Sequence, residues 1–292
     1  PAEEDGFRPA QVRVQLDRGR GMETFVDAGR VSESGALSAP DLTIGTSSVR
    51  LDGAQYRLHL DLQSNDGRRV RGDITLRASS PNALLNVLVP PFEIRGARGW
   101  RTGYVVPIAS GVLEGTLEVG GDRVSLAGGV GYHDHNWGFW QDVSWRWGHV
   151  QHHGLAVLYG RLFAPPDAAD PERLGAFLGV LGPEGPLAYT ADVTIIETDD
   201  PTSGRPRVLS VAARGPRIAL RLQFDVESSA ITRAGELGPV AGGLDFLQMR
   251  GTYTVTGRAG GRQLQFTAPG SAETFRGRAP AAPQSGRAGG GG

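Results

Sequence analysis

Apolar and polar residues alternate with a period of two through most of this 292-residue chain. Between residues 218 and 226 every second residue is Ile, Leu, Phe or Val, and Arg, Gln or Asp separates most of them. Successive side chains of a strand point to opposite faces, so this spacing predicts strands that bury one face. Helical spacing is nearly absent, and only residues 171–177 could begin a short helix. The chain is therefore predicted to be all-β.

Glycine-rich turns join several of the alternating runs into hairpins. They lie at Asn65-Asp66-Gly67, Gly120-Gly121, Gly182-Pro183-Glu184-Gly185 and Arg258-Ala259-Gly260-Gly261. An Asp-Gly pair between two alternating runs is the strongest short signal for a hairpin. Short strands with such turns favour antiparallel barrels or sandwiches. We expect two β domains, residues 1–128 and 129–278, followed by a disordered tail at 279–292 that is rich in Pro, Ala, Gly and Arg.

The composition excludes several classes of protein. The chain has no cysteine, which removes disulfides and thiolate metal sites. Its net charge of -1 gives no support for a nucleic-acid partner. No run of apolar residues is long enough for a membrane-spanning helix, although peripheral contact with a membrane stays open. No signal peptide is visible, and the compartment is not predicted.

Aromatic and titratable residues are concentrated in one short stretch of the chain. Five of the 6 histidines lie between His133 and His153, and four of the 5 tryptophans lie between Trp137 and Trp147. The stretch opens with the octet Gly131-Tyr132-His133-Asp134-His135-Asn136-Trp137-Gly138. Because it follows the predicted domain boundary, we expect it at the junction of the two domains, where ligand pockets often form.

If the octet is a strand, its side chains divide between two faces. Tyr132, Asp134 and Asn136 then share one face, whereas His133, His135 and Trp137 share the other. The two histidines could form part of a zinc site. Its third ligand would come from His149, His152 or His153. The competing interpretation is that these imidazoles bond to backbone groups or to Asp142 at a polar junction.

The other face of the octet suggests general acid catalysis by Asp134. A carboxyl group that is shielded from water has a raised pKa and can hold a proton at neutral pH. Protonation of a carbon–carbon double bond creates a cation, which aromatic faces stabilise. The four candidates for that role are Trp137, Trp140, Trp145 and Trp147. Alternatively, Asp134 caps a turn or pairs with Arg146 or Arg161. Nucleophilic catalysis has little support, because the chain has neither a Gly-x-Ser-x-Gly elbow nor a cysteine.

The octet, together with Trp145-Arg146-Trp147-Gly148-His149, resembles the signature of the carotenoid hydratase (hydroxyneurosporene synthase) family. The resemblance implies two calycin-like, or lipocalin-like, antiparallel β-barrel domains that are packed together. It also implies addition of water to a carbon–carbon double bond of an apolar polyene or terpenoid, without a cofactor or a metal. The functional Tyr and Asp of that family correspond to Tyr132 and Asp134.

The resulting hypothesis is a cofactor-independent hydro-lyase with an apolar small-molecule substrate. Asp134 would donate the proton and Tyr132 would hold it in place, with His133 and His135 in support. The substrate-binding residues would be Asn136, Trp137, Trp140, Trp145 and Trp147. Two alternatives stay open: a non-catalytic binding protein for a lipid or isoprenoid, and a cofactor-free cyclase that only shapes its substrate. Whether the chain is an enzyme is therefore not decided by its sequence.

Overall fold

The computed structural model describes residues 6–19, 21–32, 41–63, 67–79, 92–95, 101–139, 144–163, 175–233 and 244–277. These residues form nineteen strands and no helix, which confirms the predicted all-β class. Of the segment 171–177, the first four residues lie outside the described ranges, and Ala176 and Phe177 open a strand instead of ending a helix. The predicted tail at 279–292 also lies outside them.

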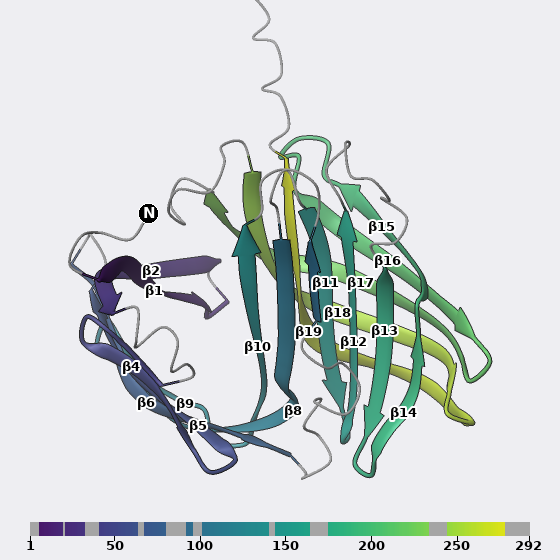
Figure 1. Ribbon diagram of the computed structural model, residues 1–292, viewed down its shortest axis with the longest axis horizontal. Coiled ribbons are helices and arrows are strands. Elements are labelled where there is room, and N and C mark those ends of the chain that lie inside the picture. The colour runs from purple at the N-terminus through teal and green to yellow at the C-terminus, as the bar shows by residue number, and fades with distance from the viewer. Residues whose placement is uncertain are drawn as a thin grey trace, which may run out of the picture.

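The N-terminal half forms one antiparallel sheet and a separate hairpin (Figure 1). The hairpin consists of β1 (Phe7–Asp17) and β2 (Met22–Ser32). The order in the sheet is β10 (Gly129–Phe139), β8 (Arg101–Val119), β6 (Arg69–Ala78), β5 (Gln55–Gln63), β4 (Ser47–Asp52) and β3 (Leu42–Ile44), and β7 (Phe92–Arg95) and β9 (Asp122–Ser125) also pair with β8. Hairpin and sheet share a core that includes Phe25, Leu62, Val70 and Val119, and Val12 and Val14 of β1 pack against it.

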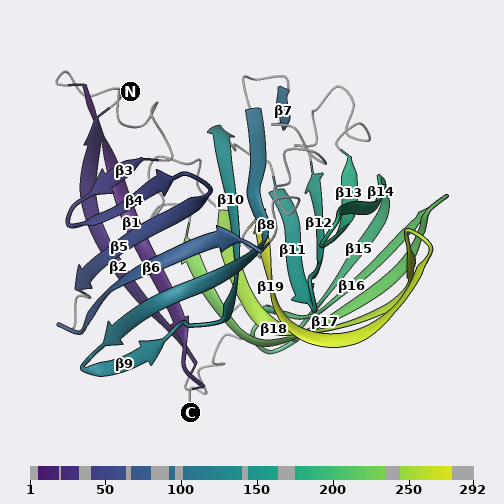
Figure 2. The same cartoon turned by 90° about the horizontal axis from the view of Figure 1, so that it is seen from below.

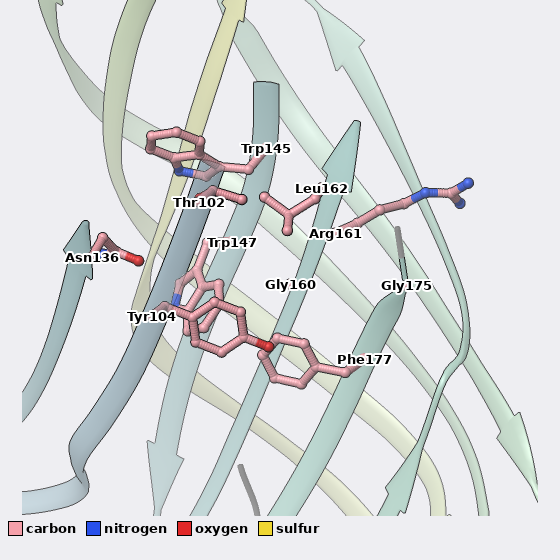
Figure 3. Close-up of a pocket in the computed structure, with 10 residues that line it drawn as sticks. All are labelled: Thr102, Tyr104, Asn136, Trp145, Trp147, Gly160, Arg161, Leu162, Gly175 and Phe177. Carbon is pink, nitrogen blue, oxygen red and sulfur yellow. The ribbon is translucent and has the colours of Figure 1, made fainter. Parts of the chain in front are cut away.

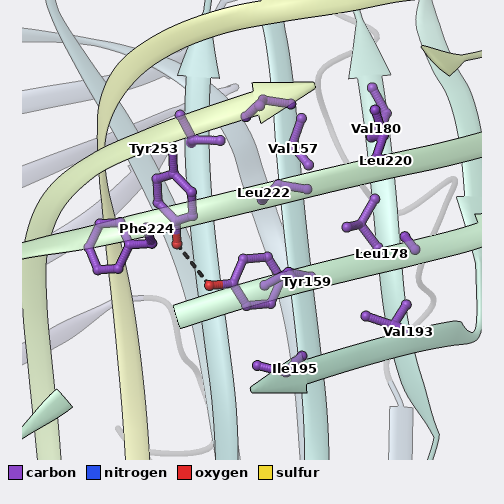
Figure 4. Close-up of a cluster of buried hydrophobic side chains, with 14 of the residues drawn as sticks. Val157, Tyr159, Leu178, Val180, Val193, Ile195, Leu220, Leu222, Phe224 and Tyr253 are labelled. Carbon is purple, nitrogen blue, oxygen red and sulfur yellow. Dashed lines mark hydrogen bonds between the residues drawn. The ribbon is translucent and has the colours of Figure 1, made fainter. Parts of the chain in front are cut away.

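The C-terminal half forms a nine-stranded antiparallel sheet that curves into a half-barrel (Figure 2). Its order is β14 (Gly185–Thr190), β13 (Ala176–Gly182), β12 (Leu155–Phe163), β11 (Ser144–His152), β19 (Arg262–Gly277), β18 (Leu244–Ala259), β17 (Ile218–Arg233), β16 (Pro206–Gly215) and β15 (Asp192–Asp199). The curve closes on a large apolar core, part of which is drawn in Figure 4. The molecule is thus all-β, as the sequence predicted, and most of its strands form two antiparallel sheets, one in each half of the chain.

Most of the predicted hairpins are present at the predicted positions. The turn at Gly120-Gly121 joins β8 to β9, and the turn at Gly260-Gly261 joins β18 to β19. Both are tight, and all four glycines have positive φ angles between 58° and 95°, a region that residues with a Cβ rarely adopt. Of the turn at residues 65–67, only Gly67 is described, but the strands on either side pair from Gln63↔Arg69 onwards.

The octet occupies β10, and its place in the fold depends on β8. This 19-residue strand pairs with β6 through its second half and with β10 through its first half. Residues 129–139 are therefore hydrogen-bonded to the N-terminal sheet, although the sequence grouped them with the second domain. The domain limits themselves stay a prediction. Side chains of β8 and β10 pack against the second sheet in a shared apolar cluster, whose buried members are Tyr104, Val106, Ala109, Trp147, Ala156, Leu158, Phe177 and Leu181.

The described residues contain no helix that is long and apolar enough to cross a membrane.

Candidate functional site

A chain of hydrogen bonds connects the octet to the second sheet. The Tyr132 hydroxyl donates to Asp134 Oδ2 at 3.1 Å, and Trp147 Nε1 on β11 donates to the Tyr132 oxygen at 2.8 Å. Four residues beyond Trp147 on β11, Gln151 Nε2 donates to the Gly131 carbonyl at 2.6 Å. Tyr132 and Asp134 lie two residues apart in the strand, so they share the face that the alternation predicted. This face of β10 looks onto β11.

The surroundings of Asp134 favour its protonated form. Burial raises the pKa of this carboxyl group, while hydrogen bonds from Tyr132 and Asn136 and the nearby His135 act in the opposite direction. Arg146 does not pair with Asp134, because its guanidinium lies 3.3 Å from Glu197. Arg161 lies over the ring of Phe163. The arginine pairing that competed with the catalytic interpretation is therefore absent at both of the arginines considered.

A second carboxyl group, Glu273 on β19, lies close to Asp134. It is directly across from Trp147 in the β11–β19 ladder, and its Oε1 accepts a hydrogen bond from Trp145 Nε1 at 3.0 Å. Burial, with a smaller contribution from the negative charge of Asp134, raises the pKa of Glu273 to about 8. Sequence reasoning missed this residue. Its one local signal is that a strand running Ser271, Glu273, Phe275 places a carboxyl group on the same face as a large aromatic ring.

A narrow cleft lies between the two sheets beside these carboxyl groups (Figure 3). Its free volume is about 20 Å³, which is enough for one water molecule. In Figure 3 the rings of Tyr104 and Phe177 lie next to each other in front of Trp147, and the Asn136 amide points in from β10. The lining residues are Thr102, Tyr104, Asn136, Trp145, Trp147, Gly160, Arg161, Leu162, Gly175 and Phe177.

A larger, mostly apolar cavity of about 340 Å³ lies between β1 of the hairpin and the N-terminal sheet, which together form a barrel, and is called the barrel cavity below. Tyr132 and His133 of β10 form part of its wall. Asp134 lies between Tyr132, which lines this cavity, and Asn136, which lines the narrow cleft. The other residues in its wall are Val12, Leu42, Ile44, Ser47, Ser48, Val49, Tyr56, Leu58, Leu60 and Leu76.

The histidines of the octet take no part in the hydrogen-bond chain from Asp134 to Trp147. His133 packs edge-on against Tyr56 at 4.5 Å in the barrel, and burial lowers its pKa to about 4, so its imidazole is neutral at pH 7. His135 is exposed and stacks with Trp137 at 5.7 Å. Trp137 lies against the backbone of Gly103, where a side chain on that residue would collide with the indole. Neither Trp137 nor His135 lines the cavity or the cleft.

His149 on β11 lies where the two sheets meet, and its imidazole is neutral at pH 7. It stacks on Tyr132 at 4.3 Å, and its Nε2 is 2.8 Å from the Ala109 carbonyl of β8. Burial lowers its pKa to about 4. His152 stacks instead on Phe266. No group of three or more metal-ligating side chains occurs in the described part of the chain. Trp140 and Asp142 lie outside it.

Replacing Tyr132 with phenylalanine is expected to raise the pKa of Asp134. The hydroxyl of Tyr132 donates to Asp134, and this bond stabilises the ionised carboxylate. Without this hydrogen bond, the rise in the pKa of Asp134 that burial causes is opposed less strongly. NMR titration of the Asp134 carboxyl carbon in wild type and Tyr132→Phe measures the effect. An unchanged or lower pKa would contradict the hydrogen-bonded arrangement, and Tyr189→Phe, at an exposed tyrosine on β14, is the control.

Known proteins resemble this chain in structure, but the comparisons by sequence found no match. No protein-family profile and no curated protein matches the chain. Among solved structures, a Nitrosomonas europaea protein given as a candidate AttH aligns with a TM-score of 0.49 and 14% identity, over 92% of this chain and 81% of that protein. CghA in complex with Sch210972 aligns with a TM-score of 0.48 and 12% identity, over 91% of this chain and 79% of CghA. At these values the likenesses carry no inference about the activity or ligand of this chain.

Proposed function

We propose that this protein adds water to a carbon–carbon double bond of an apolar polyene or terpenoid by acid catalysis. The observation that carries the proposal is the position of Asp134. Its carboxyl group has a raised pKa and a hydrogen bond from Tyr132. It lies on β10 between residues that line an apolar cavity and residues that line a water-sized cleft with aromatic walls.

In this proposal the apolar part of the substrate occupies the barrel cavity, and its double bond reaches the boundary at β10. Asp134 gives its proton to one carbon of the double bond, and the other carbon becomes a cation. Aromatic faces stabilise such a cation by roughly 0.5–2 kcal/mol each. The rings that line the cleft are Tyr104, Trp145, Trp147 and Phe177. A water molecule in the cleft, held by the Asn136 amide, then adds to the cation.

The volume of the barrel cavity limits the substrate. At about 340 Å³ it is near the lower end of the range of roughly 300–1,000 Å³ for small-molecule pockets. A short acyclic terpene fits inside such a space, whereas a long polyene has to leave part of its chain outside. We therefore expect faster turnover of a short acyclic terpene than of a long carotenoid.

An assay for the hydrated product tests the proposal. The protein is incubated separately with the short terpene β-farnesene and with the long carotenoid lycopene, and products are identified by mass spectrometry. The expected product is an alcohol that carries one added water. If neither compound is hydrated above the rate in buffer, the proposed function is wrong for both ends of the size range.

The apolar cavity also supports a second candidate, a non-catalytic carrier of a lipid or isoprenoid. Under either function, Val49→Trp should weaken binding of an apolar fluorescent probe such as anilinonaphthalene sulfonate by about tenfold, because the indole fills space that the ligand needs. Fluorescence titration measures the dissociation constant. Asp134→Asn should bind the probe as wild type does. Unchanged binding by Val49→Trp would show that the cavity is not the binding site.

A further inference from the structure

Glu273 is placed to take part in the same reaction as Asp134. It projects from β19 directly across from Trp147, and Trp145 Nε1 donates to its Oε1 at 3.0 Å. Both indoles line the narrow cleft. Asp134, on the other sheet, is connected to Trp147 by two hydrogen bonds, one from Trp147 to Tyr132 and one from Tyr132 to Asp134. The two carboxyl groups thus lie on opposite sides of the junction, and each is linked to a wall of the cleft.

Two buried carboxyl groups whose charges act on each other tend to hold one proton between them. Burial and the ionised form of Asp134 together raise the pKa of Glu273 to about 8. Among the described residues, no arginine forms an ion pair with either group, and Arg146 is held by Glu197. At neutral pH the pair therefore has one protonated member and one ionised member.

We propose that Glu273 is the general base that takes a proton from the attacking water, while Asp134 is the acid that protonates the double bond. This inference rests on the proposed function. Hydration needs both roles within one site, since a proton is delivered to carbon and another is removed from water. Asp134 delivers its proton from β10, and Glu273 takes the proton of the water on the side of β19, where Trp145 and Trp147 line the cleft.

The proton balance of the reaction closes with this pair. Protonated Asp134 gives its proton to one alkene carbon, the C–H bond forms with the π electrons, and the other carbon becomes cationic. The water oxygen forms a C–O bond to that carbon, and the Glu273 carboxylate accepts a proton from the same water. The pair ends with one proton, now on Glu273. Return of that proton to Asp134 restores the starting state without any other reactant.

Loss of Glu273 should therefore separate two steps that occur together in the wild type. In Glu273→Gln the amide oxygen can still accept the bond from Trp145, but it cannot accept a proton from water. Asp134 still protonates the alkene, and the cation loses a proton again. With β-farnesene in deuterated water, we expect deuterium incorporation within a few-fold of wild type and hydration reduced by about 10²-fold. In Asp134→Asn, both deuterium incorporation and hydration should be lost.

The pH dependence provides a second readout. Wild-type hydration should fall as pH rises through about 8, where the pair loses its single proton. In Glu273→Gln, deuterium incorporation should fall at a lower pH, because the negative charge that opposed loss of that proton is gone. The other titratable or charged groups around the pair are unchanged by the substitution: Tyr132 and His135 act on Asp134, His149 stacks on Tyr132, and Tyr104 and Arg161 line the cleft.

The outcomes distinguish this inference from the proposed function. Absence of both hydration and deuterium incorporation in the wild type would overturn the proposed function. Hydration by Glu273→Gln at the wild-type rate, or an equal loss of hydration and deuterium incorporation in a folded variant, would overturn the role of Glu273 alone. Glu184→Gln, in the exposed turn between β13 and β14, is the matched control and should behave as wild type. Thermal unfolding of each variant verifies that it is folded.

Discussion

Asp134→Asn is expected to reduce hydration of an acyclic terpene by about 10²–10⁴-fold, the usual contribution of a general acid. The amide keeps the size of the carboxyl group and can still accept the hydrogen bond from Tyr132, but it has no proton of suitable acidity to give. Because the change is local, substrate binding in the barrel cavity should persist. The predicted result is a fall in kcat with little change in KM, measured by product formation over a range of substrate concentrations.

The control for this substitution is Asp192→Asn, at an exposed carboxyl group where β15 begins. It makes the same replacement of a carboxyl group by an amide and should leave the rate unaltered. Wild-type activity in Asp134→Asn would contradict the assignment of the acid. Equal losses in both variants would indicate an effect of charge on the whole protein instead of chemistry at Asp134.

Gly148→Ala is expected to destabilise the protein strongly. Gly148 lies on β11 opposite Tyr159, and an added Cβ would collide with the hydroxyl groups of Tyr159 and Tyr253. These hydroxyls are 3.0 Å apart and form a buried hydrogen bond, drawn as a dashed line in Figure 4. Overpacking combined with loss of that bond should lower the free energy of unfolding by about 3 kcal/mol. The corresponding fall in Tm is roughly 6–12 °C.

The matched control is Gly175→Ala, because no atom lies within 4 Å of a Cβ placed on Gly175. Its Tm should stay close to that of wild type. Thermal unfolding followed by circular dichroism measures both variants. If Gly148→Ala melts like wild type, then Tyr159 and Tyr253 move apart easily, and the junction between β11 and the core is looser than its contacts imply.

Local alternation was sufficient to predict most of the strands. The run at residues 155–163 forms β12 over the same residues, and the run at 218–226 forms the first part of β17. Their boundaries follow from buried side chains at every second position and from turns that need glycine. Alternation does not report which strands pair across long separations, so the assignment of β10 to the sheet of β8 could not be predicted. Nothing in the octet distinguishes a partner that precedes it from one that follows it.

Only the part of the candidate site that lies within one strand, β10, could be predicted from the sequence. The alternation placed Tyr132 and Asp134 on one face, and the hydrogen bond between them is present. Glu273 lies in the last strand, and only the ladder between β11 and β19 brings it across from Trp147. Predicting it would have required the register of that ladder. His135 and Trp137 were grouped with the site because of their residue types, but they stack on each other outside both cavities.

Hydration of β-farnesene in water enriched in oxygen-18 shows directly whether Asp134 drives the addition of water to the double bond. The account predicts an alcohol whose added oxygen carries the heavy isotope, formed by wild type and by Asp192→Asn but not by Asp134→Asn. A product without the label would mean that the oxygen does not come from water. A labelled product formed equally well by Asp134→Asn would mean that Asp134 is not the acid.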